Sequence, residues 1–152
     1  MLPTCRQGAL RASNGSLGNL NLLHNKLGAD GAQAIIAVYE HSTKLHSLCG
    51  FTLDGFTSVD LSKKYLDAGD AMLLAAELKK GVTTGSLGTL NLLQNNLGVD
   101  GAHALVAMYE QSTTLQSLCG LTVGVTSLDL SSKHLQAADA VLLAAELKKG
   151  VT

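Results

Sequence analysis

Leucine and polar residues alternate in four short segments of the chain. The sequence reads LNL at 20–22, VDL at 59–61, LNL at 90–92 and LDL at 128–130. Successive side chains of a β-strand point to opposite faces, so this alternation predicts four strands, each half buried.

A second spacing follows these segments, with apolar residues at i, i+3, i+4 and i+7. Two such stripes are Ala32, Ile35, Ile36 and Tyr39, and Ala102, Leu105, Val106 and Tyr109; two more are Ala71, Leu74, Ala75 and Leu78, and Ala140, Leu143, Ala144 and Leu147. One stripe of this kind forms the buried side of a helix, so four helices are predicted. Asp30 stands where an N-cap is expected, and Gly81 and Gly150 follow lysines as left-handed C-caps do.

The chain also repeats itself. The segment 16–50 recurs at 86–120 with roughly two thirds of its positions identical, and 57–83 recurs at 126–152. The prediction is a single domain over 16–152, made by a tandem duplication of 16–85 and 86–152. Residues 1–15 are predicted to form a degenerate N-terminal half-repeat or cap.

Within each half, five residues follow the spacing LxxLxLxxNxL. They are Leu17, Leu20, Leu22, Asn25 and Leu27, and then Leu87, Leu90, Leu92, Asn95 and Leu97. This resembles the leucine-rich repeat, and the helical segments after it are similar to those of ribonuclease-inhibitor and NOD-like-receptor repeats. The resemblance covers nearly the whole chain from Ser16.

The resemblance implies an α/β fold, a right-handed leucine-rich-repeat solenoid forming a short horseshoe, with parallel strands on the concave side and helices on the convex side. It also implies that Asn25 and Asn95 are structural residues whose amides bond the backbone of a turn. Lys64 and Lys133 take this position in the other two units, so those turns must be built differently.

One step of the repeat is too short for the family pattern. Val59 follows Leu48 by only about 11 residues, whereas a repeat with a helix needs 20 or more. We favour a helix-free return through FTLDGF, and through TVGV in the second half, which gives six short strands. The alternative makes each SLCG segment an irregular loop and leaves four strands.

Composition narrows the function. Of 152 residues, 46% are hydrophobic and none is Trp, which indicates an aliphatic core. A formal net charge of -1 offers no basic stripe for nucleic acid and no cationic face for a membrane surface. No apolar run approaches the roughly 20 residues of a membrane-spanning helix. Neither nucleic acid nor a membrane is therefore an expected partner.

The three cysteines, Cys5, Cys49 and Cys119, are an odd set without a CxxC pair. This pattern favours reduced thiols in the cytoplasm over a disulfide framework or a zinc site. An organelle transit peptide is not expected, because the Arg-containing opening segment is short and lacks a clear amphipathic stripe.

No candidate catalytic group survives comparison of the two halves. His46 precedes Cys49 by three residues, but Gln116 holds the corresponding place before Cys119. The pair Asp60 and Asp129 would lie well over 10 Å apart in the predicted solenoid, too far for two-carboxylate catalysis. Phosphate-binding, dinucleotide and metal motifs are absent from the sequence. We therefore expect no catalysis, no metal and no cofactor.

The favoured function is a non-enzymatic protein-protein interaction module that binds an unknown protein partner through its concave strand face. The residues predicted to make that contact are Asn19, Asn21, His24, Ser58, Asp60, Lys63, Thr89, Asn91, Gln94, Ser127, Asp129 and Ser132. The alternative is a structural subunit or homo-oligomer that assembles through its uncapped solenoid ends, because such ends invite pairing with another chain.

Overall fold

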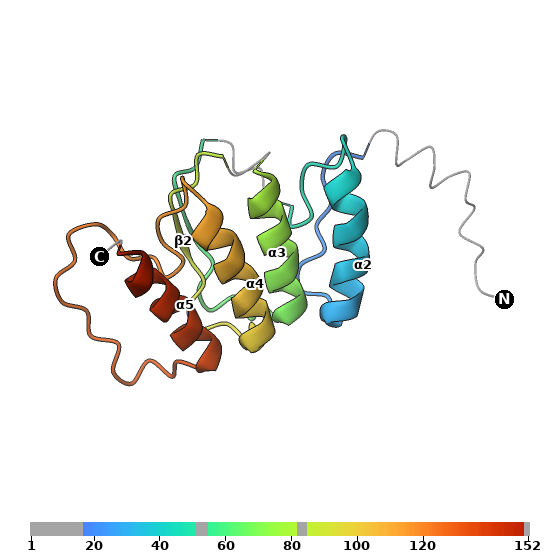
Figure 1. Ribbon diagram of the computed structural model, residues 1–152. Coiled ribbons are helices and arrows are strands. Elements are labelled where there is room, and N and C mark those ends of the chain that lie inside the picture. The colour runs from blue at the N-terminus through green and yellow to red at the C-terminus, as the bar shows by residue number, and fades with distance from the viewer. Residues whose placement is uncertain (1–16, 51–54, 82–84, 151–152) are drawn as a thin grey trace, which may run out of the picture.

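The computed structural model describes residues 17–50, 55–81 and 85–150. Its elements in chain order are α2 (Gly28–His41), β1 (Ser58–Asp60), α3 (Ala68–Lys80), β2 (Thr89–Asn91), α4 (Gly98–Gln111) and α5 (Ala137–Lys149). The helices form a row in which α3 packs between α2 and α4, and α5 packs on α4 (Figure 1). The prediction of four helices is confirmed for this part of the chain.

The predicted leucine-rich-repeat solenoid is wrong. Among the described residues β1 and β2 form the only sheet, a parallel pair in which Ser58 lies opposite Thr89 and Asp60 opposite Asn91. Two strands of three residues are far too little to build the concave wall of a horseshoe. The predicted totals of six strands and of four strands are therefore both wrong.

The SLCG segments fail to extend the sheet because their backbone is used elsewhere. They make isolated bridges that change direction, parallel between Asn19 and Ser47 and antiparallel between Asn21 and Cys49, and the second half repeats this. The N–H groups of Leu48 and Cys49 donate to the carboxylate of Glu77, at 3.0 and 2.9 Å, so they cannot join a strand ladder. Residues 51–54 of the predicted return lie outside the described residues, as does the predicted half-repeat at 1–15.

Strand formation at β1 also depends on its neighbour. β1 is paired with β2, whereas residues 127–129, which carry the equivalent sequence, lie beside no such strand in the described part of the chain and form none. Local alternation of leucine and polar residues is therefore not sufficient here, because a strand needs a hydrogen-bonding partner.

Helix ends follow the sequence only in part. Gly81 and Gly150 are C-caps with φ of 68° and 75°, as predicted. The prediction that Asp30 is an N-cap is wrong: Leu27 holds that position, and Asp30 lies in the first turn, where its charge suits the helix dipole. At α3 a capping box forms between Asp67 and Asp70, each side chain accepting the other's backbone N–H at 3.0 Å.

The core is aliphatic, as the composition predicts, with two tyrosines as its largest members. Leu73, Leu90 and Leu105 are fully buried, and so are Tyr39 and Tyr109. The hydroxyl of Tyr109 donates to the carbonyl of Gln116 at 2.7 Å. Burial, followed by the charge of Glu146, raises the pKa of Tyr109 to about 12. The raised pKa shows that the folded state favours the protonated hydroxyl. The resulting stabilisation is present at neutral pH and is lost as pH rises from 10 toward 12.

A lysine at the end of α3 holds the end of α2. Lys80 Nζ donates to the carbonyls of Tyr39, Ser42 and Leu45 at 2.8, 2.7 and 2.9 Å, and it lies 4.1 Å from the centre of the Tyr39 ring. Lys149 makes the same three bonds and ring contact at the end of α4. Each lysine thus adds a charged donor where a helix ends and its last carbonyls have no helical partner, although the Tyr39 and Tyr109 carbonyls also accept the N–H groups of Ser42 and Ser112 at 3.1 and 3.2 Å.

Replacing Lys80 with methionine should lower the free energy of unfolding by about 2 to 3 kcal/mol, because three carbonyls lose a charged donor while the apolar stem is kept. The matched control is Lys79→Met, which removes only an exposed 3.5 Å ion pair with Glu40 and should cost less than about 1 kcal/mol. Urea unfolding followed by circular dichroism measures both, and equal losses would contradict this role of Lys80.

Candidate functional site

The twelve residues predicted to bind a partner do not form a continuous face of paired strands. Nine of them are exposed, and Thr89, Asn91 and Gln94 are partly buried. The sheet brings Ser58 beside Thr89 and Asp60 beside Asn91. Asn19, Asn21, Thr89 and Asn91 bridge to the SLCG segments, while Ser127 and Asp129 lie in no sheet within the described residues.

Four of these side chains close the turn that follows their own segment. Each accepts the backbone N–H two residues ahead: Asn21 from Leu23, Asp60 from Ser62, Asn91 from Leu93 and Asp129 from Ser131, at 3.1, 2.9, 3.2 and 2.8 Å. The bonds from Ser62 lower the pKa of Asp60, and those from Ser131 lower the pKa of Asp129. Both carboxylates are therefore charged at neutral pH, and this stabilising contact is lost only as pH falls through their lowered pKa values.

Four more of the predicted residues define the shape of the same turns. His24, Lys63, Gln94 and Ser132 have φ of 63°, 57°, 62° and 53°. Their backbone is held from outside the turn in two cases, since His24 N donates to Asp70 at 3.0 Å and Gln94 N to Asp139 at 2.8 Å. A left-handed backbone fixed by a buried carboxylate indicates a structural turn in these residues.

The two asparagines implied to be structural differ in their surroundings. Asn95 is buried: its oxygen accepts from the backbone N–H of Lys64 and Leu66, and its amide donates to the carbonyls of Leu61 and Leu92. Asn25 is exposed and makes one of these bonds, to the carbonyl of Leu22 at 3.0 Å. The difference arises because the segment at 61–66 lies beside Asn95, and no corresponding segment lies beside Asn25 among the described residues.

Sequence reasoning missed the buried carboxylates, Glu77 and Glu146. Both are fully buried, and each accepts one serine hydroxyl and two backbone N–H groups from an SLC segment. Ser47 Oγ lies 2.9 Å from Glu77, and Ser117 Oγ 2.6 Å from Glu146. The sequence LLAAELKKGVT, identical in both halves, is the pattern that could have pointed to them.

Cys49 and Cys119 are free, buried thiols. Burial, and then the charge of the neighbouring glutamate, raises the pKa of each thiol far above its ordinary value. The thiolate is the nucleophilic form, so neither side chain has the properties of a catalytic cysteine.

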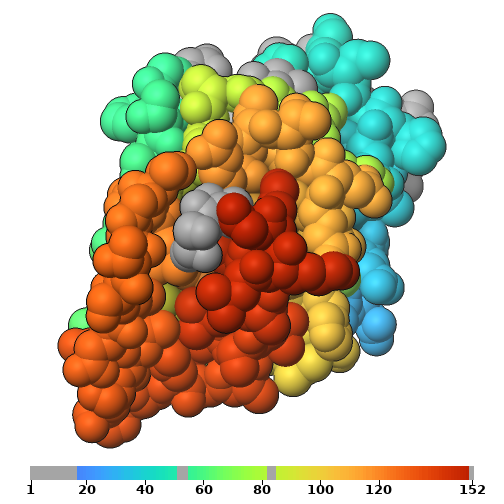
Figure 2. Space-filling model, turned by 60° about the vertical axis from the view of Figure 1, so that its left-hand side comes forward, coloured from blue at the N-terminus to red at the C-terminus, as the bar shows by residue number. Residues whose placement is uncertain are grey.

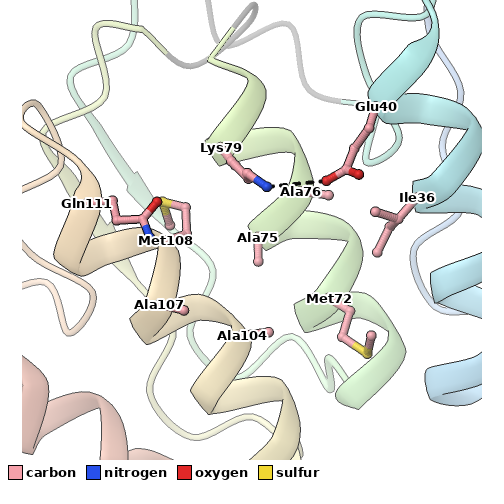
Figure 3. A pocket seen from close by; sticks show the side chains of 10 residues that line it. All are labelled: Ile36, Glu40, Met72, Ala75, Ala76, Lys79, Ala104, Ala107, Met108 and Gln111. Atoms are coloured by element: carbon pink, nitrogen blue, oxygen red, sulfur yellow. Dashed lines mark hydrogen bonds and ion pairs between the residues drawn. The ribbon is translucent and has the colours of Figure 1, made fainter.

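The outer surface of three helices carries a shallow groove of about 250 Å³. Ile36, Met72, Ala75, Ala104 and Met108 make its apolar floor, and the ion pair between Lys79 and Glu40 crosses one end (Figure 3). It is smaller than the roughly 300 to 1,000 Å³ of typical small-molecule sites, and its charged pair, Lys79 with Glu40, is exposed to solvent. We assign it no ligand.

A larger groove of about 400 Å³ lies at the outer side of α5. We call its apolar lining, together with the exposed Ala140 on the same side of α5, the α5 end face: Leu121, Val125, Leu128, Leu130, Ala140, Leu143 and Leu147. In Figure 2 α5 (red) and the preceding segment (orange) form the surface nearest the viewer. Leu147 is 63% exposed and Leu128 49% exposed, which is unusual for leucines that gather at one groove.

The first half of the chain shows what normally covers such a face. Ala71 and Leu74 of α3 correspond to Ala140 and Leu143 of α5, and both are buried beneath α4. Ala140 is exposed and Leu143 only partly buried. The same side of an almost identical helix is thus covered in α3 and open in α5.

The opposite end of the row, at α2, also exposes apolar residues, and these correspond to the α4 side of the α3–α4 interface. We call it the α2 end face: Leu17, Leu20, Leu27, Ile35 and Val38. Their counterparts in the second half, Leu87, Leu90, Leu97, Leu105 and Met108, are all buried. Val38 is 68% exposed where Met108 is 7% exposed, because α3 packs against α4 and nothing in the described chain packs on this side of α2.

Searches against protein-family models, curated proteins and solved structures find no match to this chain. No three His, Cys, Asp or Glu side chains among the described residues are placed to hold a metal ion. No helix in the described ranges is both long and apolar enough to cross a membrane.

The two asparagines provide a matched pair of substitutions. Asn95→Ala should lower the free energy of unfolding by roughly 2 to 4 kcal/mol, because it leaves buried backbone groups without partners. Asn25→Ala should change it by no more than about 0.5 kcal/mol when measured at low protein concentration. Chemical unfolding of both variants tests this, and a large loss for Asn25→Ala at low concentration would contradict its exposed position.

The buried thiols should react only when the protein opens. In a Cys5→Ser background at pH 8, labelling of Cys49 and Cys119 by a disulfide reagent should be slow and should accelerate with urea as the unfolded fraction does, because burial disfavours the thiolate. Labelling at the rate of a free thiol in native buffer would contradict the buried, protonated state.

Proposed function

We propose that this chain is a non-enzymatic protein-interaction module whose binding surface is the α5 end face. The observation that carries the proposal is the difference in burial between two copies of one helix: Ala140, Leu143 and Leu147 are more exposed than Ala71, Leu74 and Leu78. An apolar face of this kind loses unfavourable contact with water when a partner covers it.

The packing of α4 on α3 indicates the chemistry of that partner. A Cβ atom added to Gly101 would lie 2.9 Å from Ala71 Cβ and 3.2 Å from Ala68 Cα, so the two helices meet through small residues. Ala137 and Ala140 keep the same small side chains in α5. The partner is therefore an amphipathic helix that presents a glycine or alanine among larger apolar residues.

The buried polar groups among the described residues give catalysis no support. The two buried thiols have raised pKa values, and the buried carboxylates hold backbone groups. Binding through the predicted strip from Asn19 to Ser132 stays a prediction, and it is the weaker candidate because several of its side chains close turns. We further propose a cytoplasmic location, where free cysteines stay reduced.

A photoreactive benzophenone residue in place of Leu147 tests the proposal. In a cell extract it should form adducts with a protein, and mass spectrometry should map them to an amphipathic helix with a small residue on its apolar side. Adding Ala140→Arg should abolish the adducts, because the new side chain blocks close approach of a helix. Ala140 is exposed, so this change should leave the fold intact.

Three matched controls make the result specific. Ala107→Arg introduces the same side chain at an exposed position of α4 and should leave the adducts unchanged. Charge reversal at Asp60, which lies outside the α5 end face, should also leave them unchanged. The same probe at Tyr65, which is 83% exposed, should capture little. Equal labelling from positions 65 and 147, or adducts that survive Ala140→Arg, would refute the α5 end face as the binding surface.

A further inference from the structure

We infer that the helix which covers the α5 end face is α2 of a second molecule of this chain, so that molecules join head to tail. This inference rests on the proposed function and names its partner. It extends the α3–α4 interface, because α5 is the sequence copy of α3 and α2 is the sequence copy of α4.

The small residues needed for close helix packing are present on both sides. Gly101 of α4 meets Ala68 and Ala71 of α3, and the corresponding residues are Gly31 on α2 and Ala137 and Ala140 on α5. A Cβ at Gly31 would come within 4 Å only of Leu27 Cβ, in the turn before it. Gly31 is therefore unopposed by another element within the described molecule.

The larger apolar residues also correspond in pairs. Met108 of α4 and Leu78 of α3 line the same depression between the two helices. Their counterparts are Val38 and Leu147, the two most exposed large apolar residues of α2 and α5. Docking in the α3–α4 geometry brings these two side chains together and removes both from water.

The backbone edges match in register. Ser58, Val59 and Asp60 pair in parallel with Thr89, Leu90 and Asn91, and Leu61 N donates to Asn91 O at 2.8 Å. The same register places residues 127–129 of one molecule along residues 19–21 of the next. Leu130 N and Asn21 O would then bond, and neither has a backbone partner among the described residues.

Asn25 supplies side-chain hydrogen bonds at the same junction. Asn95 accepts the N–H groups of Lys64 and Leu66 at 3.0 and 3.1 Å and donates to the Leu61 carbonyl at 2.8 Å. In the head-to-tail arrangement Asn25 meets the corresponding groups of the neighbouring molecule, in residues 130–135. The amide of Asn25 donates to the carbonyl of Leu22, just as the amide of Asn95 donates to the carbonyl of Leu92. Asn25 therefore already has the orientation that Asn95 has in the second half.

The two surfaces differ from each other, so the association is heterologous and each molecule has one free end of each kind. Such an interface continues into longer assemblies unless the rotation closes a ring. The competing occupant of the α2 end face is residues 1–15 of the same chain, which the sequence predicts to form a cap. A full chain whose own segment covers that face would stay monomeric.

Analytical ultracentrifugation of the purified full chain tests the inference. The average mass should rise with concentration beyond that of a dimer. Val38→Asp blocks the α2 end face and Leu147→Asp blocks the α5 end face, so each variant alone should sediment as a monomer. A mixture of the two should form a 1:1 heterodimer that grows no further, because only one intact junction exists. Tyr65→Asp, a substitution at an even more exposed position outside both faces, should associate like the unmodified chain. Asn25→Ala should weaken association at least tenfold.

Three results would overturn the inference. The unmodified chain remains a monomer at hundreds of micromolar; or Val38→Asp alone still dimerises, which indicates symmetric pairing of α5 faces; or the full chain is monomeric and associates only after residues 1–15 are deleted. Adducts of the Leu147 probe with a different protein's helix, together with a monomeric chain, would refute self-association and leave the proposed function standing. Absence of every adduct would refute both.

Discussion

The bond between a buried glutamate and an SLC segment is the interaction on which the rest of the structure depends. A carboxylate removed from water is costly, and Glu77 offsets that cost with a serine hydroxyl and two backbone N–H donors. The bond joins α3 to a segment 28 to 30 residues earlier in the chain. Because it takes the N–H groups of Leu48 and Cys49, it also prevents that segment from becoming a strand.

Two kinds of helix interface alternate along the row as a result. Between α2 and α3, and between α4 and α5, the later helix holds the earlier unit through a buried glutamate and a lysine, Glu77 with Lys80 and Glu146 with Lys149. Between α3 and α4 contact is made through Gly101 and alanines. The first two interfaces combine these buried polar bonds with apolar contacts, whereas no buried glutamate clamps the third, where a Cβ at Gly101 would lie 2.9 Å from Ala71 Cβ. The exposed side of α5 corresponds to the α3 side of this third interface, and the exposed side of α2 corresponds to its α4 side.

The sequence was sufficient for features determined within one helix turn. Apolar stripes located all four described helices, and Gly81 and Gly150 located two of their ends. It was insufficient where partners are distant. Glu77 appears in a helical pattern as an ordinary polar residue before two lysines, and only the fold shows that it is buried. The strand predicted from the leucine alternation at 128–130 is wrong, because a strand also requires a neighbour and none lies beside this segment among the described residues.

The candidate site, like the fold, could be predicted only where its features are local in the sequence. Polar residues between the leucines looked available for a ligand, but Asn21 and Asp60 accept backbone N–H groups of their own turns, a use that residue type alone does not reveal. The duplication did establish which positions correspond. This correspondence shows that residues exposed on the two end faces have buried counterparts elsewhere in the chain. An exposed Leu147 alone would be an ordinary surface leucine. Its counterpart on α3, Leu78, is partly covered by α4. Leu147 therefore belongs to one side of an interface of the α3–α4 kind, and α2 of the same chain carries the other side.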